Sequence, residues 1–280
     1  MKIVFFGTPD YVVPIAEALY KTYRTKKDKG VVAVVTQHPK PSGRKKKMEY
    51  SAIDKWAHKR EIPILYDYAD MPVADLGVVA AYGRIIPQNV IRHFPKGIVN
   101  IHPSLLPKYR GASPVQNAIA DGETQTGVTI IKMDEKMDHG PIISSFKEEI
   151  RKDDTNETLR KRLFDRSAQF LIDLIPNYLN GKIKLKEQDH KKATFTKLVK
   201  SEDGFIENLF ENPEKTYNLW RAYQPWPGIF TKVGINDEEK RLKILKLHLE
   251  NDKLVLDEVQ LEGKKPVGFE EFKRGYPDAI

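Results

Sequence analysis

An asparagine and a histidine stand two residues apart where a predicted β-strand ends. Asn100 and His102 alternate with apolar residues, and the chain then breaks into proline and serine. Residues two apart on an extended strand project from the same face. In open α/β sheets, ligands bind just beyond the carboxyl ends of the strands. The pair is therefore a candidate reaction site. The alternative is an Asn that caps a turn and a His that donates to a nearby carbonyl.

A third polar group, Asp138, lies in a polar turn after the β-prone segment 126–133 and can meet the first two at the sheet edge. The chain has no cysteine and no G-x-S-x-G elbow, which argues against a covalent acyl-enzyme. Asn100 and His102 can donate to the oxyanion of a tetrahedral intermediate. Asp138 can orient the imidazole or take a proton from the nucleophile. The three groups together predict direct acyl transfer.

A metal site is the competing interpretation of the same polar groups. His102, Asp138 and His139 lack a recognisable ligand spacing such as H-x-x-x-H. We therefore expect no metal.

Alternating strands and helices must position these residues. Buried strands are predicted at 2–6, 31–36, 76–82 and 98–101. Helices are predicted at 12–21, 51–60, 87–92 and 113–120. This alternation predicts an α/β fold with a parallel sheet and crossovers on both faces. Breaker residues predict a loop at 37–47, and a strand at 142–149 precedes a long amphipathic helix at 155–179.

The 280 residues are enough for two domains. We expect an α/β domain over 1–181, a basic linker over 182–200 and a small β-rich domain over 201–280. The last part contains a predicted helix at 213–222 and predicted strands at 228–233, 242–248 and 254–260. It can hold only a small barrel or an open sheet.

The formal net charge of +8 points weakly to an anionic partner. The basic residues gather in two places: eight Lys or Arg lie between His38 and Arg60, and seven Lys lie between Lys182 and Lys200. Each cluster alone is most simply a solvated face. Two clusters in one chain, one of them in a Pro/Gly loop, favour phosphate contacts.

The absence of cysteine fits a cytoplasmic protein. The apolar run at the N-terminus is too short for a signal peptide and is predicted to be the first strand. No stretch approaches the roughly 20 apolar residues of a membrane span, so no membrane partner is expected.

Many short segments, in order and at sensible spacing, resemble the methionyl-tRNA formyltransferase family of the 10-formyltetrahydrofolate-dependent superfamily. The matching segments are Phe6-Gly7-Thr8-Pro9, Thr36-Gln37 with Gly43-Arg44-Lys45-Lys46, Ala80-Ala81-Tyr82-Gly83, Asn100 to Pro107, Tyr109-Arg110-Gly111-Ala112, Thr126-Gly127-Val128-Thr129, Met133-Asp134, Met137-Asp138 with Gly140, and Arg221-Ala222 with Pro225-Trp226-Pro227-Gly228. The resemblance implies a Rossmann-like catalytic domain, a linker and a C-terminal barrel related to the OB-fold. It also implies formyl transfer from 10-formyltetrahydrofolate to the α-amino group of methionine on initiator tRNA, by a protein that we expect to be a monomer.

The resemblance also assigns residues. The family's catalytic Asn, His and Asp fall on Asn100, His102 and Asp138. Its folate-binding residues fall on Ser104, Leu105, Leu106 and Pro107, and Tyr82 and Gly83 would line the same pocket. Its basic tRNA-contacting loop falls on Arg44, Lys45, Lys46 and Lys47, with Arg44 the favoured single contact.

The chain departs from the family pattern in two places. His139 and Pro141 follow Asp138 where the family more commonly has Thr-Gly-Asp or Thr-Gly-Pro. The chain after Gly228 is shorter than usual, so we expect a shortened barrel that lacks a hairpin. Its nearly balanced charge would leave tRNA phosphate contacts to the 40s loop and the linker.

The closest alternative function is a sugar N-formyltransferase that acts on a nucleotide-linked amino sugar. The Arg-Lys-Lys-Lys loop favours tRNA, because a polyanion needs such a loop and a small sugar nucleotide does not. A folate-dependent hydrolase or a purine-pathway formyltransferase would not explain the matching C-terminal segment. A non-catalytic tRNA-binding module is disfavoured because the three polar groups are intact.

Overall fold

The structure, a computed structural model, describes residues 1–43, 46–235, 238–277 and 279. It contains two compact units. The first consists of Met1–Ala112, Gln125–Glu149 and Arg160–Thr196, and the second of Ser113–Thr124, Ile150–Leu159 and Lys197–Ile280. Each unit is assembled from three separate segments of the chain, whereas each predicted domain is one continuous segment. The boundaries of the predicted domains stay a prediction.

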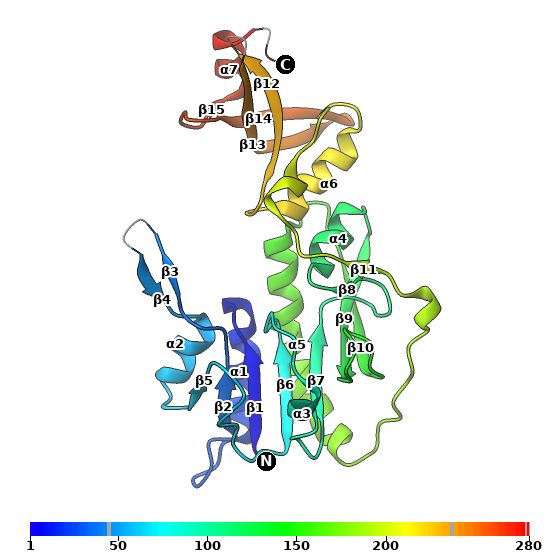
Figure 1. Ribbon diagram of the computed structural model, residues 1–280. Coiled ribbons are helices and arrows are strands. Elements are labelled where there is room, and N and C mark those ends of the chain that lie inside the picture. The colour runs from blue at the N-terminus through cyan, green and yellow to red at the C-terminus, as the bar shows by residue number, and fades with distance from the viewer. Residues whose placement is uncertain (44–45, 236–237, 278, 280) are drawn as a thin grey trace. The chain divides into compact units, whose positions relative to one another are not determined.

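The first unit is built on a seven-stranded sheet with the order β10-β9-β7-β6-β1-β2-β5 (Figure 1). Its strands are β1 (Ile3–Gly7), β2 (Val31–Val35), β5 (Ile64–Leu65), β6 (Leu76–Ala80), β7 (Ile98–His102), β9 (Gln125–Lys132) and β10 (Ile142–Glu149). The five strands from β7 to β5 run parallel, which confirms the predicted parallel sheet. The edge pair differs, because β9 runs antiparallel to β7 and β10 antiparallel to β9.

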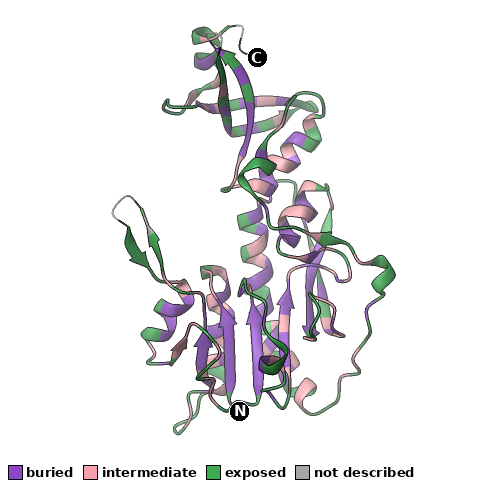
Figure 2. Cartoon of the chain, in the orientation of Figure 1, coloured by how far each residue is buried: buried purple, intermediate pink, exposed green. Residues whose placement is uncertain are grey.

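Continuous apolar runs explain why the central strands lie inside. Every residue of β1 and of β6 is buried (Figure 2). Strands of a parallel sheet are covered on both faces, so they read as unbroken hydrophobic segments and do not alternate. The helices of this unit include α1 (Val13–Tyr23), α2 (Ala52–His58), α3 (Gln88–Ile91) and most of α5 (Asn156–Leu179). The strand order reverses between β1 and β6, and β7 is the next strand beyond β6.

The predicted loop at 37–47 is wrong in part, because β3 (Lys40–Ser42) and β4 (Lys47–Glu49) form an antiparallel hairpin there. Pro41, which argued against a strand, pairs with Met48 in this two-stranded ribbon. A ribbon has open edges, where a missing N–H is tolerated. Gly43 supplies the turn with a φ of +68°. Arg44 and Lys45 lie outside the described residues.

The second unit contains a small antiparallel sheet with the order β12-β13-β14-β15. Its elements are α4 (Pro114–Ala120), α6 (Pro213–Tyr223), β12 (Ile229–Ile235), β13 (Glu238–Glu250), β14 (Lys253–Leu261), β15 (Val267–Gly268) and α7 (Phe269–Gly275). Leu242, Ile244 and Val259 lie at the centre of its core. The β-rich C-terminal domain is thus confirmed. Among the described residues, β12 does not pair with β15, so the sheet stays open.

A short strand pairing brings the basic linker after α5, which we call the connector, back to the first unit. β8 (Arg110–Gly111), which follows β7, runs parallel to β11 (Phe195–Thr196). The segment before β11 includes a single turn at His190–Lys192. Residues near 110 and near 190 therefore meet although about 80 residues separate them.

Candidate active site

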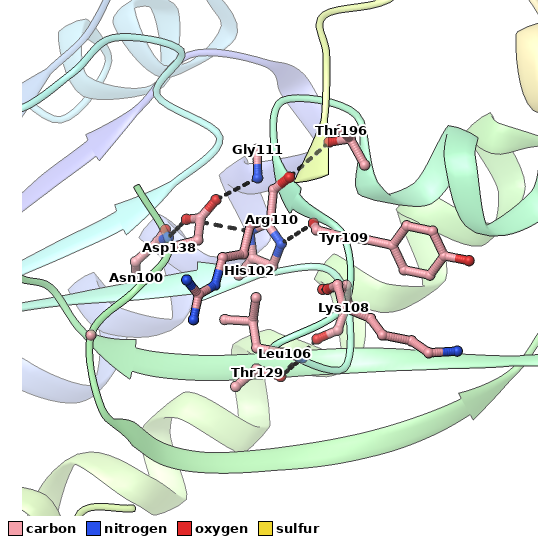
Figure 3. Close-up of polar contacts among 12 residues, drawn as sticks. Asn100, His102, Leu106, Lys108, Tyr109, Arg110, Gly111, Thr129, Asp138 and Thr196 are labelled. Atoms are coloured by element: carbon pink, nitrogen blue, oxygen red, sulfur yellow. Dashed lines mark hydrogen bonds and ion pairs between the residues drawn. The ribbon is translucent and has the colours of Figure 1, made fainter. Parts of the chain in front are cut away.

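The three predicted polar groups meet at the end of β7. Asp138 comes from the loop between β9 and β10, and its Oδ1 accepts a hydrogen bond of 3.1 Å from Asn100 Nδ2 (Figure 3). His102 Nδ1 lies 3.5 Å from the same oxygen, and Asp138 Oδ2 accepts from the main-chain N of Gly111 at 2.8 Å. The carboxylate is therefore aimed at both side chains of the strand. The catalytic roles of the three residues stay predictions.

The second nitrogen of His102 defines where its protons lie. Nε2 is 2.9 Å from the main-chain oxygen of Tyr109, which can only accept, so Nε2 carries a proton. Nδ1 then faces the Asp138 carboxylate, 3.5 Å from Oδ1. Asn100 uses one of its two Nδ2 hydrogens on Asp138. Both nitrogens of His102 therefore face acceptors, and the second Nδ2 hydrogen of Asn100 is the N–H that this arrangement can offer to a developing oxyanion.

The segment assigned to folate binding, Ser104 to Pro107, forms a turn that packs on β9. Ser104 is fully buried, and its hydroxyl donates to the main-chain oxygen of Lys108 at 2.7 Å. Thr129 of β9 donates to the main-chain oxygen of Ser104 at 2.7 Å and accepts from the N–H of Leu106 at 3.0 Å. The turn is thus rigidly tied to the sheet. Its contact with folate, including that of Leu105, stays a prediction.

The other segment assigned to folate, Tyr82 and Gly83, follows β6. The Tyr82 ring is buried and lies edge-on to Phe6, with 5.8 Å between ring centroids, and burial raises the pKa of its hydroxyl. Thr8 and Gln37 donate to the main-chain oxygen of Tyr82 at 3.0 and 3.1 Å. Because the Tyr82 side chain belongs to the core, main-chain atoms are what this turn can present to a ligand.

A hollow of about 340 Å³ lies beside the loop that carries Asp138. Its walls come from α3 and the residues after it and from the loop, and they consist of Gln88, Ile91, Arg92, Asp134, Glu135, Lys136 and His139. Gln88 donates to Glu135 at 3.0 Å across this space. Sequence reasoning did not assign these residues to a ligand site. Only the adjacency of 134–139 to Asp138 in the chain could have indicated them.

The chain matches the family described as "Formyl transferase" over residues 1–175 and "Formyl transferase, C-terminal domain" over residues 198–255. The methionyl-tRNA formyltransferase of Roseiflexus castenholzii is 36% identical, with 98% of this chain and 96% of the relative covered. That of Thermotoga maritima is also 36% identical, with 98% and 95% covered. The chain belongs to the methionyl-tRNA formyltransferase family.

Solved structures agree with the fold expected for this family. The methionyl-tRNA formyltransferase from Clostridium thermocellum has a TM-score of 0.61 to the chain at 21% identity, with 93% and 98% of the two chains covered. An N-formyltransferase from Helicobacter canadensis, solved with folinic acid and dTDP-3-aminofucose, has a TM-score of 0.65 at 16% identity, with 96% and 98% covered. At these identities the likenesses show the fold alone.

The basic loop predicted for this formyltransferase lies apart from the catalytic candidates. Lys46 and Lys47 belong to the β3–β4 hairpin, which follows β2, and both are exposed. β1 and β6 stand between β2 and β7 in the sheet, so the structure does not bring these lysines to Asp138. Their contact with tRNA stays a prediction, as does that of Arg44 and Lys45.

Sequence reasoning missed two buried side chains of this formyltransferase that contact the Asp138 loop or approach it. Arg110 is 3% exposed, and burial lowers the pKa of its guanidinium, although Asp138 and Asp134 oppose the shift. Gln188 is 5% exposed and lies in the basic connector. Arg110 was part of the resembling segments without a role, and no pattern distinguished Gln188 among the surrounding lysines.

In the part of the chain that the structure describes, no group of three or more His, Cys, Asp or Glu side chains could hold a metal ion. Within the same residues, no helix is long and apolar enough to cross a membrane.

Proposed function

We propose that this chain transfers the formyl group of 10-formyltetrahydrofolate to the α-amino group of methionine esterified to initiator tRNA. The observation that carries the proposal is the convergence of Asn100, His102 and Asp138 at the carboxyl end of β7. It occurs in a chain whose relatives, at 36% identity over almost the full length, are methionyl-tRNA formyltransferases. The absence of cysteine fits direct attack of the amine on the formyl carbon.

The residues divide the work of such a reaction. The amine attacks the formyl carbon, the C–O π bond becomes an oxyanion, and the attacking nitrogen becomes positively charged. Asn100 donates its second Nδ2 hydrogen to the oxyanion, and His102 stabilises it by charge once it has taken up a proton at Nδ1. Asp138 accepts the proton of the attacking nitrogen, directly or through His102, from its position at 3.1 Å from Asn100 and 3.5 Å from His102. When the intermediate collapses, the C–O π bond re-forms, the C–N bond to folate breaks, and that nitrogen takes up the proton that Asp138 or His102 removed from the amine.

The hollow beside the Asp138 loop is the proposed place for the folate ring system. Its walls carry the carboxylates of Asp134 and Glu135 and the amide of Gln88. A pterin presents ring and exocyclic N–H donors that carboxylates and amide oxygens recognise. The predicted Ser104–Pro107 turn and the main chain at Tyr82–Gly83 complete the proposed folate surface.

The tRNA is proposed to contact the lysines of the β3–β4 hairpin and of the connector. The same proposal places the protein in the cytoplasm, because initiator tRNA is charged and used there. It also takes the protein to be a monomer.

The test is an acceptor competition with the full chain. Radiolabelled 10-formyltetrahydrofolate is offered with methionyl-tRNA and, in parallel, with a panel of nucleotide-linked amino sugars. Label on methionyl-tRNA alone supports the proposal. Label on a sugar with none on methionyl-tRNA contradicts it and would establish the sugar N-formyltransferase alternative.

A further inference from the structure

A buried arginine links the connector after α5 to the end of β7. Arg110 Nη2 and Nε donate to Gln188 Oε1 at 2.6 and 3.2 Å, and Nη2 lies 2.8 Å from His190 Nδ1. A guanidinium can only donate, so both partners accept. The Gln188 amide therefore has a single orientation, because its oxygen end must face Arg110.

The nitrogen end of the same amide holds the Asp138 loop. Gln188 Nε2 donates to the main-chain oxygens of Asp138 and Gly140 at 2.9 and 2.8 Å. Both N–H groups thus meet acceptors. A flipped amide would set its oxygen against two carbonyls and its NH₂ against the guanidinium, so the network fixes every one of these contacts.

The loop has a backbone that needs such support. Asp138 has a φ of +48°, in the left-handed region that residues with a side chain rarely adopt. Two residues on, a Cβ at Gly140 would collide with the main-chain oxygen of Lys132, so the loop also packs closely against the end of β9. The direction of the Asp138 carboxylate follows from this backbone. A shift of the loop would move the carboxylate away from Asn100 and His102.

The connector touches the loop a second time, through His190. Its ring stacks on that of His139 with centroids 4.0 Å apart and an interplanar angle of 4°. His139 Nδ1 in turn lies 2.7 Å from Asp134 Oδ2, at the start of the same loop. The connector therefore contacts the loop through an amide at 138–140 and through a ring at 139.

We propose that Arg110, Gln188 and His190 form a clamp that places Asp138 for catalysis, and we call it the Asp138 clamp. The proposal rests on the proposed function, because formyl transfer is the reaction that the clamp serves. All three are positioning residues: their contacts run to the Asp138 and Gly140 main chain, to His139 and to one another. The connector, whose lysines predict phosphate contacts, thus has a second task in the active site.

Gln188→Glu is the sharpest test. A glutamate keeps an acceptor for Arg110 and adds an opposite charge, so the buried guanidinium stays satisfied. It removes both N–H donors and sets a carboxylate oxygen against the carbonyls of Asp138 and Gly140. His190→Ala, at an exposed position, is the second variant, and Glu187→Gln is the control at the exposed neighbouring residue.

Three measurements separate positioning from a merely structural role: steady-state kinetics, the thermal midpoint and histidine spectra. We expect kcat for methionyl-tRNA to fall about 100-fold in Gln188→Glu and less in His190→Ala, with KM for the tRNA unchanged. The thermal midpoint should stay within about 3 °C of the parent. In ¹⁵N-histidine spectra, the His102 ring signals of Gln188→Glu should move towards those of Asp138→Asn. Glu187→Gln should resemble the parent in every measurement.

Parent-like kcat and parent-like His102 signals in Gln188→Glu would overturn the clamp. If Gln188→Glu proved unfolded, a parent-like kcat and parent-like His102 signals in His190→Ala would overturn the clamp. The histidine spectra need no acceptor. If the protein formylated no methionyl-tRNA, the proposed function would be wrong. The spectra would still decide whether the clamp places Asp138.

Discussion

At the scale of single residues, Asp138 combines an unfavourable backbone with a well-satisfied side chain. Its φ of +48° costs an ordinary residue roughly 1–2 kcal/mol, and Asp and Asn tolerate this region better than most. Its carboxylate accepts from Asn100 and Gly111, and its main-chain oxygen accepts from Gln188. A residue held at both ends in this way can keep a fixed direction towards His102.

Asp138→Asn isolates the charge of this residue, because asparagine fits the same backbone and nearly the same volume. We expect kcat to fall by about 10²–10⁴-fold, since proton transfer to a positioned carboxylate contributes about that much. The far-ultraviolet circular dichroism and the binding of folinic acid, an unreactive folate, should match the parent. Turnover close to the parent value would show that Asp138 takes no part in proton transfer.

The strand period alone made Asn100 and His102 predictable as a pair, because it is set by local backbone geometry. Asp138 was predictable from the polar turn that follows a strand. Gln188 was not, because its place depends on the β8–β11 pairing and on a partner 78 residues away. A tertiary contact of this kind produces no periodic pattern in the sequence.

The β3–β4 hairpin was not predictable for a local reason. Pro41 indicates a loop unless the strand is known to lie in a two-stranded ribbon.

At the scale of elements, a carboxylate on α1 fastens α2 to α1. Glu17 Oε2 accepts from Trp56 Nε1 at 2.8 Å and pairs with Arg60 Nη2 at 2.6 Å. Burial alone would raise the pKa of Glu17, but the bonds from Trp56 and Lys21 and the charge of Arg60 together lower it below its ordinary value. A lowered pKa in the folded state means that the ionised form stabilises the fold. That stability is present above the unfolded-state pKa of about 4.3 and is lost as the pH falls through the folded-state pKa.

Glu17→Gln should therefore make the first unit less stable at neutral pH and should matter less in acid. We expect the free energy of unfolding to fall by about 1–2 kcal/mol at pH 7, and the difference from the parent to shrink as the pH is lowered below about 4. The chain has three tryptophans, so a Trp220→Phe/Trp226→Phe background leaves Trp56 as the reporter in urea titrations.

Glu61→Gln is the control for this prediction, because Glu61 is 93% exposed and lies 4.0 Å from Lys29. Its removal should change stability by a few tenths of a kcal/mol at most. An equal loss for Glu17→Gln at pH 7 and pH 3 would show that the carboxylate charge is not what fastens α2.

At the scale of the whole molecule, the C-terminal sheet and the β3–β4 hairpin differ in how many of their lysines have a carboxylate partner. Three lysines of the C-terminal sheet pair with carboxylates: Lys232 with Glu239 at 2.7 Å, Lys240 with Glu238 at 3.1 Å and Lys246 with Glu258 at 2.6 Å. The β3–β4 hairpin instead carries Lys40, Lys46 and Lys47 beside the single carboxylate of Glu49. An RNA phosphate must displace a carboxylate to reach a paired lysine, whereas an unpaired lysine releases only counterions. The charges thus favour the hairpin over the C-terminal sheet as a tRNA contact.

Lys46→Gln/Lys47→Gln should weaken tRNA binding and should leave the chemical step intact. Each lost phosphate contact removes about 0.7–0.9 from the slope of log K against log salt, so the double variant should bind more weakly at low salt and respond less to added salt. With saturating tRNA, kcat should match the parent, because the hairpin lies two strands away from β7. Lys232→Gln/Lys246→Gln removes the same charge from two lysines of the C-terminal sheet that pair with carboxylates, and it should leave affinity and salt slope nearly unchanged. Equal losses in the two double variants would place tRNA phosphates on the C-terminal sheet as well, in spite of its paired charges.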